Sequence, residues 1–190
     1  LILPIIETAA GLAGLIYGQC DAATQVSLKV IGDHSRAVVH MIADGITAAN
    51  VGRGYVLRRL IRRVVRHGRL IGIPGAFLSQ VAETAIQLAE TAFPNTRQRA
   101  AAIKAELDRE EARFLETLER GEKLLTEILA REQGSAQGQV SGLDAFVLYD
   151  TYGFPLELTQ EIAEEQGLTV DLEGFEAAMA EQRQRSQAAH

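Results

Sequence analysis

The sequence predicts an all-α, multihelical fold, and three observations support this prediction. Helix-favouring Ala, Leu, Glu, Gln and Arg dominate the composition, tryptophan is absent, and aromatic residues make up only 5% of the 190 residues. This balance is typical of helical proteins rather than of sandwiches or barrels. Apolar side chains also recur at helical spacing along the chain. With 47% hydrophobic residues, the protein can bury one sizeable core or two small ones.

The N-terminal segment and the cysteine content indicate the cellular setting. The first 18 residues are broken by Pro4, Glu7 and three glycines, so they form neither a signal peptide nor a membrane span. The single cysteine, Cys20, cannot form an internal disulfide or by itself a zinc site. We therefore expect a reducing location, cytoplasmic or organellar. The chain opens on Leu1 within an apolar pattern, which suggests that it is part of a longer protein.

Three helices are expected in the first half of the chain. Residues 28–44 carry apolar side chains at helical spacing, and Gly45 ends that helix. A glycine-containing loop, 45–54, then leads into an arginine-rich helix. A turn at Pro74 and Gly75 precedes a further helix that Pro94 closes. The side chains that this helix is expected to bury are Phe77, Val81, Ile86 and Leu88.

The second half begins with a long, charged helix over about 97–132, which we interpret as a spacer or as half of a helical hairpin. Residues 133–142 are rich in Gly, Gln and Ser, as flexible connections are. We therefore expect two helical subdomains, 1–132 and 143–190, joined by this linker. The second subdomain should contain a helix to Asp150, the turn "DTYGFP", a helix ending near Gly167, and a helix capped by Asp171. The apolar seam of the long helix consists of Phe114, Leu118, Leu125 and Leu129.

The segment from Asn50 to Arg69 contains seven arginines, although the chain has a net charge of −6. On a helical wheel its Val, Leu and Ile side chains fall on one side and most of its arginines on the other. A solvated face usually mixes both signs, because like charges one turn apart repel. No Asp or Glu occurs between Gly45 and Ala82, however. The segment therefore predicts an outward-facing basic stripe, and we expect this stripe to bind an anionic partner.

Arginine is also much more frequent than lysine, with 16 Arg to 3 Lys in the whole chain. Its planar fork matches phosphate oxygens with two parallel hydrogen bonds, which lysine cannot do. Nucleic acid is therefore the leading partner, and an anionic membrane surface is second. Another alternative is a helical protein-interaction module, in which the stripe docks an acidic partner and the 97–132 helix forms a coiled coil. A plain solvated face is the remaining interpretation.

Three motifs in fixed order, "VIGDHSRAVVHMIADG", "DGITAANVGRGYVLRRLIRRVVRHG" and "LYDTYGFPLELT", make the chain resemble the alanyl-tRNA synthetase family. The resemblance runs over essentially the whole chain and implies the all-helical tRNA-recognition region that follows the aminoacylation core. It implies binding of the tRNA-Ala acceptor stem, which that family identifies by a G·U wobble as the third base pair. The residues that resemble the readers of this pair are Asn50 and Asp150.

The chemistry of these two side chains agrees with the resemblance. Asp only accepts hydrogen bonds and Asn both donates and accepts, so together they can test both kinds of group in the wide minor groove of A-form RNA. The arginines would then supply phosphate contacts without sequence information. We predict these contacts from Arg53, Arg58, Arg59, Arg62, Arg63 and Arg66.

No catalytic site is expected in this chain itself. The resemblance implies that ATP binds in a catalytic domain upstream and zinc in an editing domain downstream, and that these domains of the parent ligase are partners. We assign no cofactor or metal here, because His34, His40, His67 and His190 lack the spacing of a metal site. We interpret three acids of the long helix, Glu110, Glu111 and Glu116, as a solvated charge run.

Overall fold

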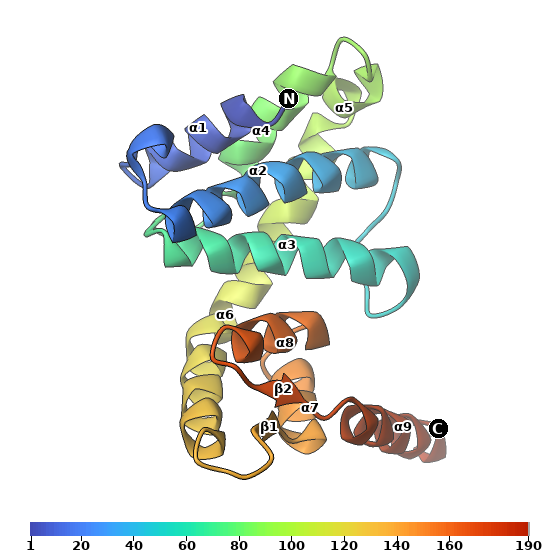
Figure 1. Cartoon of the computed structure of the whole chain (residues 1–190). Coiled ribbons are helices and arrows are strands. Elements are labelled where there is room, and N and C mark those ends of the chain that lie inside the picture. Colours follow the sequence, from blue (N-terminus) through green and yellow to red (C-terminus); the bar gives the residue numbers. More distant parts are fainter. Residues whose placement is uncertain (190) are drawn as a thin grey trace. The chain divides into compact units, whose positions relative to one another are not determined.

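The computed structural model describes residues 1–189 and divides into two compact units, Leu1–Arg113 and the part from Phe114 onward. The described residues form nine α-helices, one short 3-10 helix and two strands of two residues each. The predicted all-α fold is therefore confirmed (Figure 1). None of the described helices is long and apolar enough to cross a bilayer. His190 lies outside the described residues.

The first unit begins with two helices joined by a 3-10 turn. Helix α1 spans Leu3–Leu12, the turn η1 spans Tyr17–Gln19, and α2 spans Ala22–Ala43. Helix α2 begins earlier than the predicted residue 28, because the Asp21 carboxylate accepts a hydrogen bond from the Thr24 amide at 2.8 Å and caps it there. It ends as predicted, with Gly45 at a φ of 91° that favours glycine.

Four helices complete the first unit: α3 (Gly52–Leu70), α4 (Leu78–Ala89), α5 (Pro94–Gln98) and the start of α6 (Ala100–Glu132). Helix α2 packs between α1 and α3, and α4 contacts both α1 and α2 (Figure 1). Pro94 opens α5 instead of closing α4, because proline at the first position of a helix has no amide hydrogen to leave unpaired. The predicted burial of Leu88 is wrong, since 48% of this residue is exposed.

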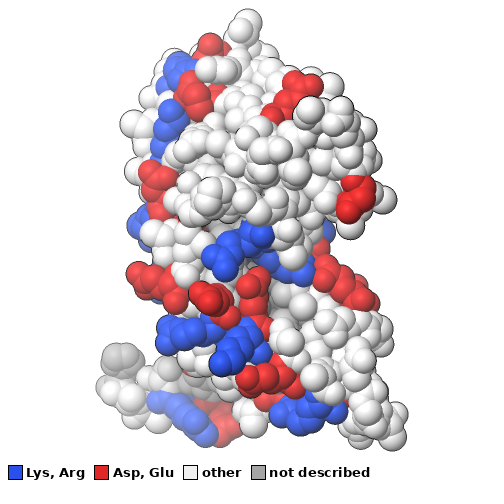
Figure 2. Space-filling model, turned by 90° about the vertical axis from the view of Figure 1, so that its left-hand side faces the viewer, with Lys and Arg blue, Asp and Glu red and all other residues white. Residues whose placement is uncertain are grey.

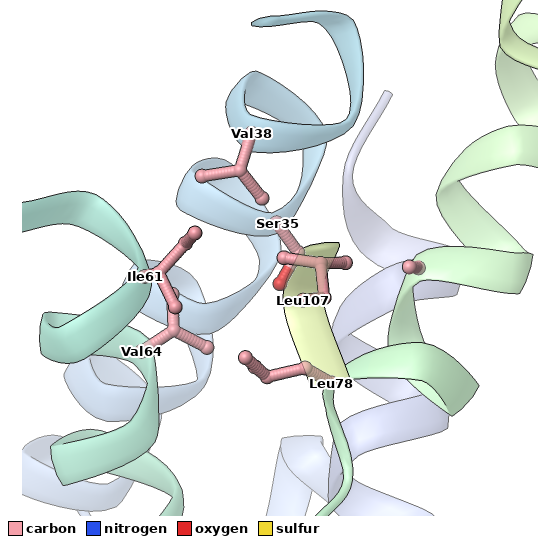
Figure 3. Close-up of a pocket in the computed structure, with 7 residues that line it drawn as sticks. Ser35, Val38, Ile61, Val64, Leu78 and Leu107 are labelled. Atoms are coloured by element: carbon pink, nitrogen blue, oxygen red, sulfur yellow. The ribbon is translucent and has the colours of Figure 1, made fainter. Parts of the chain in front are cut away.

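The core of the first unit forms where α2, α3, α4 and α6 converge. Figure 3 shows Val38 of α2, Ile61 and Val64 of α3, and Leu107 of α6 directed toward one another, with Leu78 of α4 beside them. The gap between these side chains has no room for a water molecule, as expected for a close-packed interior. This packing fixes the apolar side of α3 and with it the direction of the arginines on its other sides.

The second unit contains the rest of α6 and five further elements. These are β1 (Gln139–Val140), α7 (Gly142–Asp150), α8 (Leu156–Glu164), β2 (Thr169–Val170) and α9 (Leu172–Ala188). Strand β1 lies within the segment 133–142 and pairs in parallel with β2, so this segment is part of the second unit. The two units divide within α6. The predicted cap at Asp171 is confirmed by the hydrogen bond from the Gly174 amide at 3.0 Å.

The predicted seam of α6 is buried within this chain. The side chains of Phe114 and Phe154 pack edge to face with ring centroids 5.5 Å apart. Where the seam passes Gly121, a Cβ would come within 2.5 Å of the Phe154 ring, so only glycine permits this approach. Thr117 of α6 also donates a hydrogen bond to the Tyr152 carbonyl at 2.6 Å. The seam therefore packs against the turn after α7, which does not favour the coiled-coil alternative.

We expect Gly121→Ala to destabilise the protein by about 1–3 kcal/mol, because the added methyl group overpacks the contact with the Phe154 ring. Gly11→Ala is the matched control, because Gly11 also lies within a helix but no atom lies within 4 Å of the place that its new methyl group would occupy. This control should gain stability from the better helix propensity of alanine. Urea denaturation followed by circular dichroism measures both variants, and equal stabilisation by the two would contradict the packing argument.

Candidate nucleic-acid interface

Helix α3 buries the apolar side that its sequence predicts. Leu57, Ile61, Val64 and Val65 are each no more than 1% exposed. The preceding loop carries Asn50, and the exposed Arg53 lies in the first turn of the helix. Ala49 donates its amide to the Gly54 carbonyl at 3.1 Å, which closes this loop onto the first turn of α3. The loop conformation is therefore set by its own backbone and by the packing of α3.

The prediction of one outward-facing arginine stripe is wrong for three of its members. Arg58, Arg62 and Arg66 are only 8%, 5% and 5% exposed, and they follow one another at intervals of four residues along one edge of the buried side. Arg58 and Arg62 meet the buried Glu110 of α6, so this polar edge of α3 faces the interior. These three arginines are therefore not available as surface phosphate contacts.

Glu110 of α6 supplies the acid that the neighbourhood of α3 in the sequence lacks. Arg58 Nε donates to Glu110 Oε1 at 2.7 Å, and Arg62 Nε donates to the same oxygen at 2.9 Å. Glu110 is fully buried, and burial opposes its ionisation, but the hydrogen bonds and charges of the two arginines hold the pKa of its carboxyl below the ordinary value. Burial also disfavours the charged form of Arg62 and lowers its pKa, while the attraction of Glu110 opposes this effect.

The other arginines of the predicted set remain accessible to different degrees. Arg53 is exposed, while Arg59 and Arg63 are half-buried. Arg63 Nη1 lies 2.9 Å from His34 Nε2, and His34 Nδ1 lies 3.0 Å from Asp33 Oδ2. Arginine can only donate, so His34 accepts through Nε2 and carries its proton on Nδ1 toward Asp33. Burial lowers the pKa of His34, and the Asp33 hydrogen bond opposes this effect.

The structure places Asn50 and Asp150 in different units, each exposed and each beside a helix end. Asn50 lies in the loop before α3, and Asp150 is the last residue of α7. Asn50 Oδ1 accepts a hydrogen bond from Arg58 Nη1 at 2.5 Å. Asp150 Oδ1 accepts one from Gln182 Nε2 of α9 at 2.7 Å. Each predicted reader is thus oriented by one neighbouring donor from its own unit.

The interpretation of Glu110, Glu111 and Glu116 as a solvated charge run is correct only for Glu116, which is exposed. Glu111 is fully buried and accepts hydrogen bonds from the amides of Phe77 and Leu78 at 3.1 and 3.3 Å, at the start of α4. Burial raises the pKa of its carboxyl to about 7, although these two hydrogen bonds oppose the shift. Both buried acids lie on the same side of α6 as Leu107 and Phe114, which pack inward. This helical spacing is the sequence signal that could have predicted their burial.

On one face of the molecule, charged side chains of both signs occur together (Figure 2). Several exposed cations pair locally with acids: Arg97 Nη2 lies 2.8 Å from Glu83 and Arg131 Nη2 lies 2.7 Å from Asp144. Hydrogen bonds from Arg97 and Lys104 lower the pKa of Glu83 to about 2. Pairs of this kind contribute little to stability and neutralise the surface locally.

All residues, 1–190, match the family model described as tRNA synthetases class II (A). The chain belongs to this family. Its relatives in the class II (A) family include alanine–tRNA ligases of Picosynechococcus sp., 70% identical, Crocosphaera subtropica, 69% identical, and Nostoc sp., 68% identical. Each match covers 100% of this chain but only 21% or 22% of the relative. This class II (A) chain therefore spans about a fifth of the length of the curated relatives it matches.

In this class II (A) chain, Glu111 predicts a pH dependence of stability. Its pKa rises from 4.5 to about 7 on folding, so its contribution is present below pH 4.5 and is lost as the pH rises to 7. Glu111→Gln keeps the hydrogen-bond acceptor but cannot ionise. We expect this variant to remove a decline on the order of 2 kcal/mol in the free energy of unfolding between pH 4.5 and pH 7.

Urea denaturation at both pH values measures the effect of Glu111→Gln. The control is Glu116→Gln, since Glu116 lies on the same helix but is exposed. A parallel decline in the wild type and in Glu111→Gln would show that another group is responsible.

Proposed function

We propose that this chain is the tRNA-recognition part of an alanine–tRNA ligase, which holds the acceptor stem of tRNA-Ala in support of ATP-dependent attachment of alanine. Its relatives of 66–70% identity over the whole chain are alanine–tRNA ligases, and their names supply the amino acid. Catalytic and editing domains of the same ligase would be its partners. Such a role places the chain where proteins are made, in the cytoplasm or in an organelle.

The observation that carries the proposal is the exposed and oriented state of Asn50 and Asp150. Both are small polar side chains beside helix ends, and each has one atom held by a neighbour of its own unit. Loops and helix ends reach the wide minor groove of A-form RNA more easily than helix flanks do. In the proposal, Asn50 and Asp150 read the third base pair and distinguish G·U from G·C.

The phosphate contacts are assigned to those arginines of the predicted set that are accessible on α3, which excludes Arg69 because it is not in that set. Arg53 lies in the first turn, next to the Asn50 loop, and Arg59 and Arg63 follow along the helix. These three positions supply affinity without sequence preference. The buried Arg58, Arg62 and Arg66 act within the protein instead.

Arg53→Gln should weaken binding of G·U and G·C acceptor-stem hairpins equally and reduce the salt dependence by about one phosphate contact. Fluorescence anisotropy with both hairpins at two salt concentrations measures these quantities. Arg69→Gln is the matched control, because Arg69 is exposed on the same helix but lies outside the proposed contact set. Equal loss of affinity in both variants would indicate a diffuse charge effect rather than a defined phosphate contact.

Asn50→Ala and Asp150→Ala should each reduce the preference for the G·U hairpin over the G·C hairpin, with a smaller change in affinity for G·C. The reason is that a lost base contact costs discrimination of about 1–3 kcal/mol, whereas phosphate contacts are common to both hairpins. The same anisotropy titrations give the ratio of the two dissociation constants. If neither substitution changes this ratio, the assignment of the readers fails.

A further inference from the structure

Asn50 is joined to the buried interior by a short chain of hydrogen bonds. Its Oδ1 accepts from Arg58 Nη1, and the Nε and Nη2 groups of Arg58 donate to the two oxygens of Glu110, at 2.7 and 3.4 Å. The Arg58 side chain is 10% exposed and that of Glu110 is 0% exposed. An exposed loop residue is therefore held by a guanidinium that is itself fixed from inside the protein.

The same face of α6 holds the loop at a second point. Glu106, one turn before Glu110, accepts a hydrogen bond from the Ala48 amide at 2.8 Å. A Cβ at Gly54 would come within 2.5 Å of the Thr47 carbonyl, so the loop lies close against the first turn of α3. Glu106 thus fixes the backbone just before Asn50, while Arg58 fixes its side chain.

The chemistry of arginine also decides which end of the Asn50 amide faces inward. A guanidinium has only donors, so the atom beside Arg58 Nη1 must be the oxygen, Oδ1. The amide nitrogen, Nδ2, is then the group that Asn50 can offer to a ligand. The matching group on a stem is an acceptor, such as a pyrimidine O2 or a purine N3 in the minor groove.

We propose that Arg58 and Glu110 are positioning residues for Asn50, and that their ion pair fixes Asn50 as a hydrogen-bond donor toward the RNA. This inference rests on the proposed function. It assigns to two buried residues an effect on base-pair discrimination that is separate from their effect on stability. Arg62 does not share this role, although it contributes the same type of charge to the same carboxylate.

Arg58→Met and Arg62→Met form a matched pair for the test. Both variants remove a buried guanidinium from Glu110 Oε1, at 2.7 and 2.9 Å respectively, so both should lower stability. Of these two arginines, it is Arg58 that donates to Asn50 Oδ1. We expect Arg58→Met to bring the ratio of G·U to G·C hairpin affinities down to that of Asn50→Ala. Arg62→Met should keep the wild-type ratio among folded molecules.

Asn50→Asp provides a test that does not disturb the core. The new carboxylate can still accept from Arg58, with a stronger, charge-assisted bond, but its second oxygen only accepts. We expect this variant to remain folded and to lose the G·U preference as completely as Asn50→Ala. The unfolding free energy of each variant in urea, measured alongside the titrations, confirms that the ratios come from folded protein.

The outcomes separate this inference from the proposed function. If Asn50→Ala leaves the affinity ratio unchanged, Asn50 is not a reader and both proposals fail. If Asn50→Ala removes the preference but Arg58→Met retains it, only the positioning role is overturned. A loss of the ratio in Arg62→Met equal to that in Arg58→Met overturns it too, because a general softening of the core would then explain both. Retention of the preference by Asn50→Asp overturns the donor role.

Discussion

The buried carboxylate of Glu110 is the group on which the arrangement around α3 depends. It joins α6 to two successive turns of α3 through Arg58 and Arg62. Removing such charges from water costs several kcal/mol per ion, which close attraction and hydrogen bonds offset only when the geometry is good. The fold therefore needs α3 and α6 in one register, and the same register brings Glu106 to the Ala48 amide. One helix face thus sets both the core and the loop beside it.

The abundance of arginine in α3 consequently has a structural cause as well as a proposed functional one. Arginine can run its aliphatic stem along an apolar interior and place a planar, rigid fork at a carboxylate, which lysine does less well. The guanidinium groups of Arg58 and Arg62 both lie at the carboxylate of Glu110. The exposed Arg53 in the first turn of α3 places a positive charge near the Asn50 loop, and in the proposed function this charge favours an approaching phosphate backbone.

Local sequence patterns predicted the helices and the apolar sides well but did not reveal which polar residues are buried. The seam of α6 and the caps at Gly45 and Asp171 follow from short-range rules, and all of them are present in the structure. The partner of Arg58 lies 52 residues away, however, and no local rule connects them. The register of the seam could have indicated it, since Glu110 and Glu111 stand where Leu107 and Phe114 predict an inward position. The pairing of β1 with β2 likewise joins distant residues of very short segments.

Asn50 and Asp150 belong to different units, yet each is oriented inside its own unit. Arg58 donates to the side-chain oxygen of Asn50, and Gln182 donates to one carboxylate oxygen of Asp150. Thr117 donates a hydrogen bond to the Tyr152 carbonyl and so fixes the turn that follows Asp150. In the proposed function, a stem that binds both residues therefore pays little side-chain entropy at either one. The donor or acceptor character of each reader is then set before binding.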